Sequence, residues 1–123
     1  METHVMADDH PITISPNANR VRVNFARRTV ANTTHALSLK EATYPAVQYI
    51  PRADVDMSLL TRTQHHTHCP YKGDASYYSI NVDGRVAENA IWTYEQPFPG
   101  VAQIAGYMAF YPNRVDAIDH GPA

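Results

Sequence analysis

The sequence predicts a mainly β protein, a single compact domain with one or two short helices. Three observations support this fold class. Apolar and polar residues alternate in several short runs, which is the pattern of half-buried strands. Turn-forming residues separate the runs at short intervals. The chain has 123 residues, the usual size of one domain and enough to bury a hydrophobic core.

No internal repeat, low-complexity tract or linker divides the chain. We expect residues 10–119 to form the domain, residues 1–9 to be a disordered or frayed lead-in, and residues 120–123 to be a short tail.

The first half of the chain contains a series of candidate strands. Pro45 and Pro51 flank the last of them and place it at a sheet edge or between bends, because proline cannot donate to a strand ladder. The expected strands are 12–14, 21–25, 29–33, 36–39 and 46–50.

A short helix is expected next. Asp54 can act as its N-cap, with residues 55–60 forming the helical turns. The polar run 61–68 is interpreted as an exposed loop that leads into the following motif.

In the second half, Asp83-Gly84 is a strong hairpin signal. It predicts a hairpin between strands 75–82 and 86–94. Pro97 to Gly100 breaks the pattern, and the remaining expected elements are a helical turn at 101–104 and strands at 106–111 and 115–118.

Charge and cysteine content limit the classes of partner. The net charge of −2 does not favour nucleic acid, although four arginines cluster in the first hairpin as either a solvated face or a phosphate-binding patch. No apolar stretch approaches the roughly 20 residues of a membrane span, and Met1 to His4 do not resemble a signal peptide. One cysteine cannot form an internal disulfide, so we expect a cytoplasmic protein. We also expect a monomer or a weak homodimer. The clustered arginines are Arg20, Arg22, Arg27 and Arg28.

The segment Cys69-Pro70-Tyr71-Lys72-Gly73-Asp74-Ala75 is the best candidate for a site. It combines the only cysteine, a lysine and a conformationally free glycine, directly before an expected strand. A lysine between proline, an aromatic residue and glycine has restricted mobility, and partial desolvation would make its charge chemically useful. The motif does not by itself name a reaction.

Several motifs in order resemble one family, the domain of unknown function 427 (DUF427). The resemblance runs from about His10 to Asp116. Residues 26–28 depart from it, because the family often has a glycine turn there, and this puts the geometry of that hairpin in doubt. The motifs that carry the resemblance are Leu39-Lys40-Glu41-Ala42, Tyr44-Pro45, Tyr49-Ile50-Pro51-Arg52, Asp54-Val55, Thr67, Cys69 to Ala75, Trp92-Thr93-Tyr94-Glu95, Gly106-Tyr107 and Ala109-Phe110-Tyr111-Pro112.

The resemblance implies a strongly bent antiparallel fold, similar to the β-tent of methionine-R-sulfoxide reductases and of the thalidomide-binding domain of cereblon. It implies no activity, because the family has no settled biochemical role and a shared fold does not carry function.

Metal and thiol chemistry are both weakly supported. The zinc of related tent folds is held by two Cys-x-x-Cys pairs, which one cysteine cannot supply. His65, His66 and His68 with Cys69 are poor substitutes because adjacent residues rarely converge on one ion. We therefore expect no metal and no cofactor. Cys69 is interpreted as a small hydrophobic residue, with a nucleophile activated by Lys72 or a nearby histidine as the alternative.

Nucleotidyl transfer would need paired carboxylates that hold Mg²⁺ against a triphosphate. Asp54 and Asp56 are such a pair in spacing, but the chain has no Gly-Ser turn to hold the phosphates. Helix capping explains both residues more simply.

A polar cluster beside aromatic segments is the most promising combination. If its members converge, they would form an aromatic-walled pocket that binds a small anionic or aromatic ligand. The alternatives are a structural ion pair of Glu41 with Arg52 or Lys72, an enzyme that uses Lys72 or Cys69 with Glu41, or a protein-interaction module built on edge strand 46–50. The predicted ligand-binding residues are Glu41, Arg52, Lys72, Tyr78, Trp92 and Tyr94.

Overall fold

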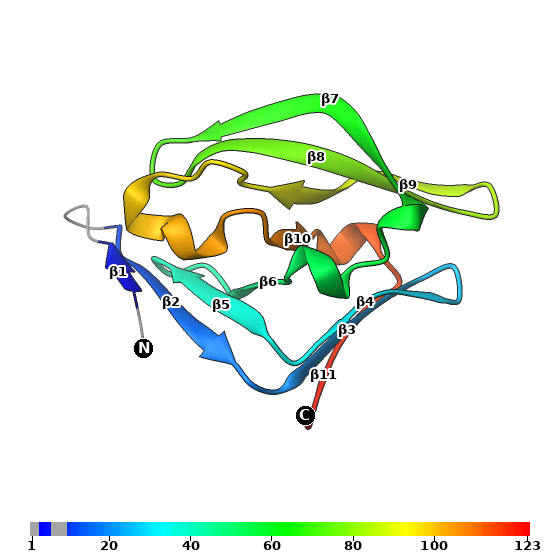
Figure 1. Ribbon diagram of the computed structural model, residues 1–123, viewed down its shortest axis with the longest axis horizontal. Helices are drawn as coiled ribbons and strands as arrows, with labels where there is room; N and C mark the ends of the chain where they lie inside the picture. The colour runs from blue at the N-terminus through cyan, green and yellow to red at the C-terminus, as the bar shows by residue number, and fades with distance from the viewer. Residues whose placement is uncertain (1–2, 6–9) are drawn as a thin grey trace.

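The structure, a computed structural model, describes residues 3–5 and 10–123. Its β-strands pair antiparallel and form three sheets. One sheet forms one side of the molecule in the order β10-β9-β8-β7, and the other two sheets lie on the opposite side (Figure 1). The strands of this four-stranded sheet are β7 (Leu60–Cys69), β8 (Gly73–Val82), β9 (Arg85–Thr93) and β10 (Met108–Phe110).

The two other sheets are formed largely by the first half of the chain. Thr3–Val5 of the expected lead-in form β1 and pair with β2, while residues 1–2 and 6–9 of that lead-in lie outside the described residues. The second sheet has the order β1-β2-β5-β6, with β2 (Ile12–Asn17), β5 (Ala36–Glu41) and β6 (Val47–Tyr49). The third has the order β11-β3-β4, with β3 (Arg20–Phe25), β4 (Arg28–Thr33) and β11 (Ala117–Gly121).

Short 3₁₀ turns connect the strands and are the only helical elements among the described residues. The expected helix after Asp54 is a single such turn, Met57–Leu59, and Asp56 rather than Asp54 caps it: the Asp56 carboxylate accepts from the backbone N–H of Ser58 at 3.2 Å. No helix in the described part of the chain is long and apolar enough to cross a membrane. The turns are η1 (Arg52–Asp54), η2 (Met57–Leu59), η3 (Pro99–Ile104) and η4 (Pro112–Arg114).

The predicted hairpin at Asp83-Gly84 is confirmed. Both residues have positive φ, +51° and +85°, the geometry of a two-residue hairpin turn. The hairpin between β3 and β4 has the same geometry without glycine, since Ala26 and Arg27 have φ of +50° and +66°. The departure from the family pattern at residues 26–28 therefore leaves this turn intact.

The interpretation of residues 61–68 as a loop is wrong. They belong to β7, which pairs with β8 from Leu60 to Cys69 with a register shift between Arg62 and His66. Most of its side chains are exposed, and β7 is the edge strand of its sheet. Sequence patterning missed it because both faces are polar.

The hydrophobic core lies between the sheets in two clusters. One is centred on β3, β4, β8 and β9 and the other on β2, β5, β8 and η3. As its flanking prolines predicted, β6 is an edge strand, and Ile50 just beyond it exchanges two 2.8 Å hydrogen bonds with Met108 of β10. This bridge joins two sheets, and the mainly β fold class is confirmed.

Candidate functional site

The tight turn between β7 and β8 positions Lys72. Its backbone N–H donates to the carbonyl of Cys69 at 3.3 Å, and its carbonyl accepts from the N–H of Phe98 at 2.9 Å. Gly73 follows with φ of +115°, which residues with a side chain rarely adopt. A Cβ there would lie 3.6 Å from backbone atoms of Gln96 and Phe98. The glycine therefore allows the sharp turn, and the hydrogen bonds fix the direction of the lysine.

Lys72 forms an ion pair with Glu41, at the end of β5. The two side chains are only 8% and 19% exposed. An unpaired charge in such surroundings would be strongly destabilising, so the pairing permits the lysine to be buried. His10 Nε2 lies 2.6 Å from the other carboxylate oxygen of Glu41, and the His10 ring stacks on Tyr71 with centroids 3.8 Å apart.

The surroundings of Glu41 lower its pKa below the ordinary 4.5. Burial acts to raise the pKa, but hydrogen bonds and charges from Lys72 and His10 stabilise the carboxylate more. Lys72 Nζ also lies 6.0 Å from the ring centroid of Tyr94, at the outer limit of a cation–π contact. Burial raises the pKa of Tyr94, so its hydroxyl stays protonated at neutral pH.

A cavity of about 340 Å³ opens beside this ion pair. We call it the tyrosine cavity, because tyrosines make up much of its wall. Its position between β5, β6 and the face of β8 and β9 brings together residues from distant parts of the chain. The lining residues are Leu39, Glu41, Tyr44, Pro45, Val47, Tyr49, Thr67, Lys72, Tyr77, Trp92, Tyr94 and Tyr111.

Three hydroxyl groups in the wall, those of Thr67, Tyr77 and Tyr111, form a connected network. The Tyr77 hydroxyl lies 2.9 Å from Thr67 Oγ1 and 3.2 Å from the Tyr111 hydroxyl. Burial and the contact with Tyr77 raise the pKa of Tyr111 to about 12. The indole N–H of Trp92 donates to the Tyr49 hydroxyl at 3.1 Å, which leaves the proton of that hydroxyl available as a donor. The wall thus combines aromatic surface with neutral hydrogen-bonding groups.

Four of the six predicted ligand-binding residues meet at this cavity. Glu41, Lys72, Trp92 and Tyr94 all contribute to its wall, although they come from three separate regions of the sequence. Of the proposed structural ion pairs, the structure contains the one between Glu41 and Lys72. The pair lies in the cavity wall, so its structural and ligand-binding roles are compatible.

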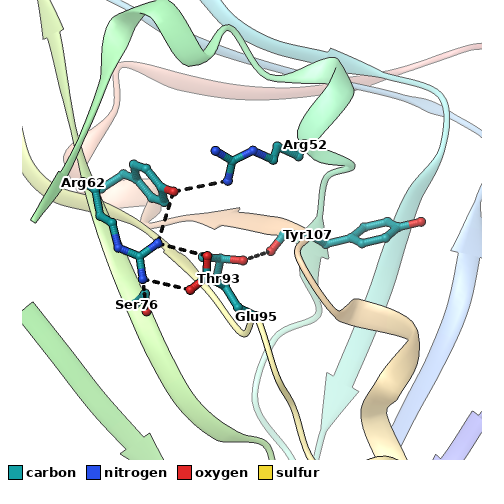
Figure 2. A network of polar contacts seen from close by, with 7 residues as sticks. Arg52, Arg62, Ser76, Thr93, Glu95 and Tyr107 are labelled. Atoms are coloured by element: carbon teal, nitrogen blue, oxygen red, sulfur yellow. Dashed lines mark hydrogen bonds and ion pairs between the residues drawn. The ribbon is translucent and has the colours of Figure 1, made fainter.

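Arg52 and Tyr78 lie elsewhere, in what we call the arginine network. Tyr78 follows Tyr77 on β8 and therefore faces the opposite side of the sheet. Arg52 and Arg62 approach its hydroxyl at 3.2 and 3.5 Å, and each guanidinium carbon lies 5.8 Å from its ring centroid (Figure 2). Arg62 also donates two hydrogen bonds to Glu95, at 3.0 and 2.8 Å, which lower the pKa of that carboxyl group.

Comparison with protein families identifies the chain. The family model described as a domain of unknown function (DUF427) matches residues 13–121, almost the whole domain. The chain belongs to the DUF427 family. No curated protein matches it in a direct search.

In this DUF427 domain, the cysteine of the motif lies outside the cavity wall. Cys69 is half-buried and packs against the second core cluster. Asp54 and Asp56, the possible metal-binding pair, also have other partners. The Asp54 carboxylate accepts from Thr33 Oγ1 at 2.7 Å, and Asp56 caps η2.

The histidines before the motif point to different neighbours. The His65 ring packs edge-on against Tyr77 with centroids 4.5 Å apart, while His68 Nδ1 lies 2.6 Å from an Asp74 carboxylate oxygen. Among the described residues, no group of three or more histidine, cysteine, aspartate or glutamate side chains is arranged to hold a metal ion.

Sequence reasoning did not predict several residues of the site as ligand-binding, although Tyr49, Thr67 and Tyr111 belong to the motifs that carry the family resemblance. Tyr77 is paired directly with Trp92 across β8 and β9, so the two side chains share one face of the sheet. That pairing is a signal that a correct hairpin register would have supplied. The other missed residues, which needed the tertiary structure, are His10, Tyr49, Thr67 and Tyr111.

Proposed function

We propose that this DUF427 domain binds a small planar ligand that carries an anionic or hydrogen-bond-accepting group. The site is the tyrosine cavity. The observation that carries the proposal is the ion pair of Lys72 and Glu41 in the wall of a cavity otherwise dominated by aromatic side chains. Small-molecule sites have this composition, with apolar walls and a few fixed polar groups.

The aromatic residues favour a flat ligand. Trp92 packs edge-on against Tyr49 with centroids 6.2 Å apart, and at a tilt of 44° against Tyr111 with centroids 4.5 Å apart. These contacts hold the rings in place before a ligand arrives, which reduces the entropy cost of binding. Each ring presents a face or an edge to a planar partner.

The polar groups favour an acceptor or an anion on that ligand. The tyrosine hydroxyls keep their protons at neutral pH and can donate, since the pKa values of Tyr49, Tyr94 and Tyr111 are all raised. Lys72 adds a fixed positive charge, and Glu41 both holds it in place and can accept from a donor on the ligand. A ligand with a carboxylate or an adjacent donor and acceptor fits this set.

Thermal unfolding against a panel of ligands tests the proposal. The panel contains aromatic carboxylates, nucleobases, nucleotides and sugar phosphates, each with wild type, Lys72→Met and Arg28→Met. Arg28 is an exposed cation on β4, away from the cavity wall, and serves as the matched control. A ligand at a hundred times its Kd adds about 2.7 kcal/mol to the stability of the folded protein.

We expect planar acceptor-bearing ligands to raise the unfolding midpoint by several degrees in wild type and Arg28→Met, and much less in Lys72→Met. A midpoint shift that is equal in all three proteins would place the ligand outside this cavity. If no planar compound raises the unfolding midpoint, and Lys72→Met is itself strongly destabilised, the ion pair has only a structural role.

A further inference from the structure

A second cavity, of about 270 Å³, is also lined by Trp92. We call it the apolar cavity. Its wall consists mostly of aliphatic and aromatic side chains from β3, β6, β10 and β11. The lining residues are Val21, Val23, Ala46, Val47, Gln48, Ile50, Trp92, Phe110, Pro112, Ile118 and His120.

The polar lining residue Gln48 already makes hydrogen bonds within the protein. The Gln48 side chain donates to Ser38 Oγ at 3.1 Å and accepts from Asn17 Nδ2 at 3.0 Å. The lining contains no lysine, arginine or carboxylate. The other polar lining residue, His120, is exposed on β11. Apart from it, the cavity offers an occupant contact area without a charged partner, and an uncharged hydrocarbon group satisfies that condition.

The two cavities share part of their walls. Val47 and Trp92 line both, so the tyrosine cavity and the apolar cavity are neighbours across these two side chains. Trp92 is held by its hydrogen bond to Tyr49 and its packing on Tyr111, whereas Val47 lies on the short edge strand β6. Trp92 is thus held in place by its neighbours, whereas Val47 belongs to a strand that pairs along only one edge.

We propose that the two cavities hold one amphiphilic ligand, with a planar acceptor-bearing head in the tyrosine cavity and a hydrocarbon tail in the apolar cavity. This rests on the proposed function and adds a ligand class to it. The tail passes beside Val47 and Trp92. The common wall of the two cavities and the contrast in their chemistry both match a ligand with one polar and one apolar end.

A homologous series of ligands tests this. Benzoate and its 4-ethyl, 4-butyl and 4-hexyl derivatives are titrated into the protein by calorimetry. Each methylene transferred from water to an apolar site contributes about fourfold in affinity, so affinity should rise steeply with chain length until the apolar cavity is full. Lys72→Met should weaken every member of the series by a similar factor, because it alters only the site of the head.

Two variants fill the apolar cavity from its partly exposed wall. Ala46→Phe and Ile118→Phe each add volume from a different element, one just before β6 and the other on β11, so that a folding defect in one does not remove the test. Both should flatten the dependence of affinity on chain length. Ala102→Phe on η3 is the matched control, an exposed alanine outside both linings, and should retain the full dependence.

The outcomes separate the two proposals. A head group that binds through Lys72 with no gain from the alkyl chain overturns the amphiphile inference and leaves the proposed function standing. Affinity that rises with chain length but ignores Lys72→Met overturns both. A gain that persists in Ala46→Phe and Ile118→Phe places the tail elsewhere and overturns the inference. A concentration-dependent dimer that excludes alkyl ligands, observed by light scattering, would assign the apolar cavity to a second copy of the chain instead.

Discussion

Lys72 and Glu41, 31 residues apart in the sequence, form a largely buried ion pair that holds the β7–β8 turn against the end of β5. Neither charge is well solvated, so each depends on the other. The same pair lies in the wall of the tyrosine cavity, which links the stability of the fold to the proposed site.

The first prediction concerns this pair. Lys72→Met and Glu41→Gln should each lower the free energy of unfolding by about 3 kcal/mol, because each removes the ion-pair partner of a largely buried charge. The double variant should lose clearly less than the sum of the two. Urea unfolding of all four proteins gives the coupling energy. Losses that simply add would show that the two side chains do not interact appreciably in solution.

The second prediction is a pH dependence. The folded-state pKa of Glu41 lies below its unfolded value near 4.5, so its stabilising effect is complete above that pH and disappears as the pH falls through the folded pKa. The stability advantage of wild type over Glu41→Gln should therefore be constant near neutral pH and shrink below about pH 4.5.

Comparing wild type with a variant isolates Glu41 from Glu95, whose lowered pKa acts in the same window. Glu88→Gln, at an exposed position on β9, is the control and should show a small difference at all pH values. A stability gap between wild type and Glu41→Gln that widens on acidification would contradict the assigned sign.

The third prediction concerns Gly73. Gly73→Ala should cost about 1–3 kcal/mol, because alanine is strained at φ of +115° even though no atom lies closer than 3.6 Å to its Cβ. Gly121→Ala is the matched control, with open space and no positive φ, and should change stability by less than about 0.5 kcal/mol. Chemical denaturation compares the two, and equal effects would mean that the turn relaxes to accept a side chain.

The fourth prediction separates the tyrosine cavity from the arginine network through neighbouring residues. Tyr78→Phe removes the hydroxyl that accepts from Arg52 and Arg62, and should cost about 1 kcal/mol without changing ligand affinity. Tyr77→Phe removes a hydroxyl of the cavity wall and should weaken binding of an acceptor-bearing ligand. Calorimetry with the best ligand of the panel measures both. A loss of affinity in Tyr78→Phe would extend the site across β8.

Sequence patterns predicted most strands because one face of each is buried. The alternation in residues 21–25 corresponds to β3, and the positive φ angles at Asp83 and Gly84 match the expected hairpin. The same reasoning failed for β7, since an edge strand that is exposed on both sides leaves no apolar alternation. It also misassigned the cap, because Asp54 and Asp56 are both plausible from local sequence and only the contact with Thr33 decides between them.

Part of the candidate site could likewise be predicted from the sequence, and part could not. Lys72 and Gly73 could be singled out from the sequence, since a motif of proline, aromatic, lysine and glycine restricts a turn locally. The sequence could not predict whether Arg52 or Glu41 would pair with that lysine, because both are far from it along the chain. The structure places Glu41 beside Lys72 and directs Arg52 to Tyr78.

The sequence by itself determined the mainly β fold class, the family and the tight turn that presents Lys72, because these depend on periodicity, turn chemistry and local motifs. The tertiary structure alone decided which side chains share a cavity. A strand sends successive residues to opposite faces, so the packing of the sheets assigned Tyr77 to the tyrosine cavity and Tyr78 to the arginine network. It also placed the apolar cavity next to the tyrosine cavity, across Val47 and Trp92, by folding β3, β6 and β11 around one side of β9.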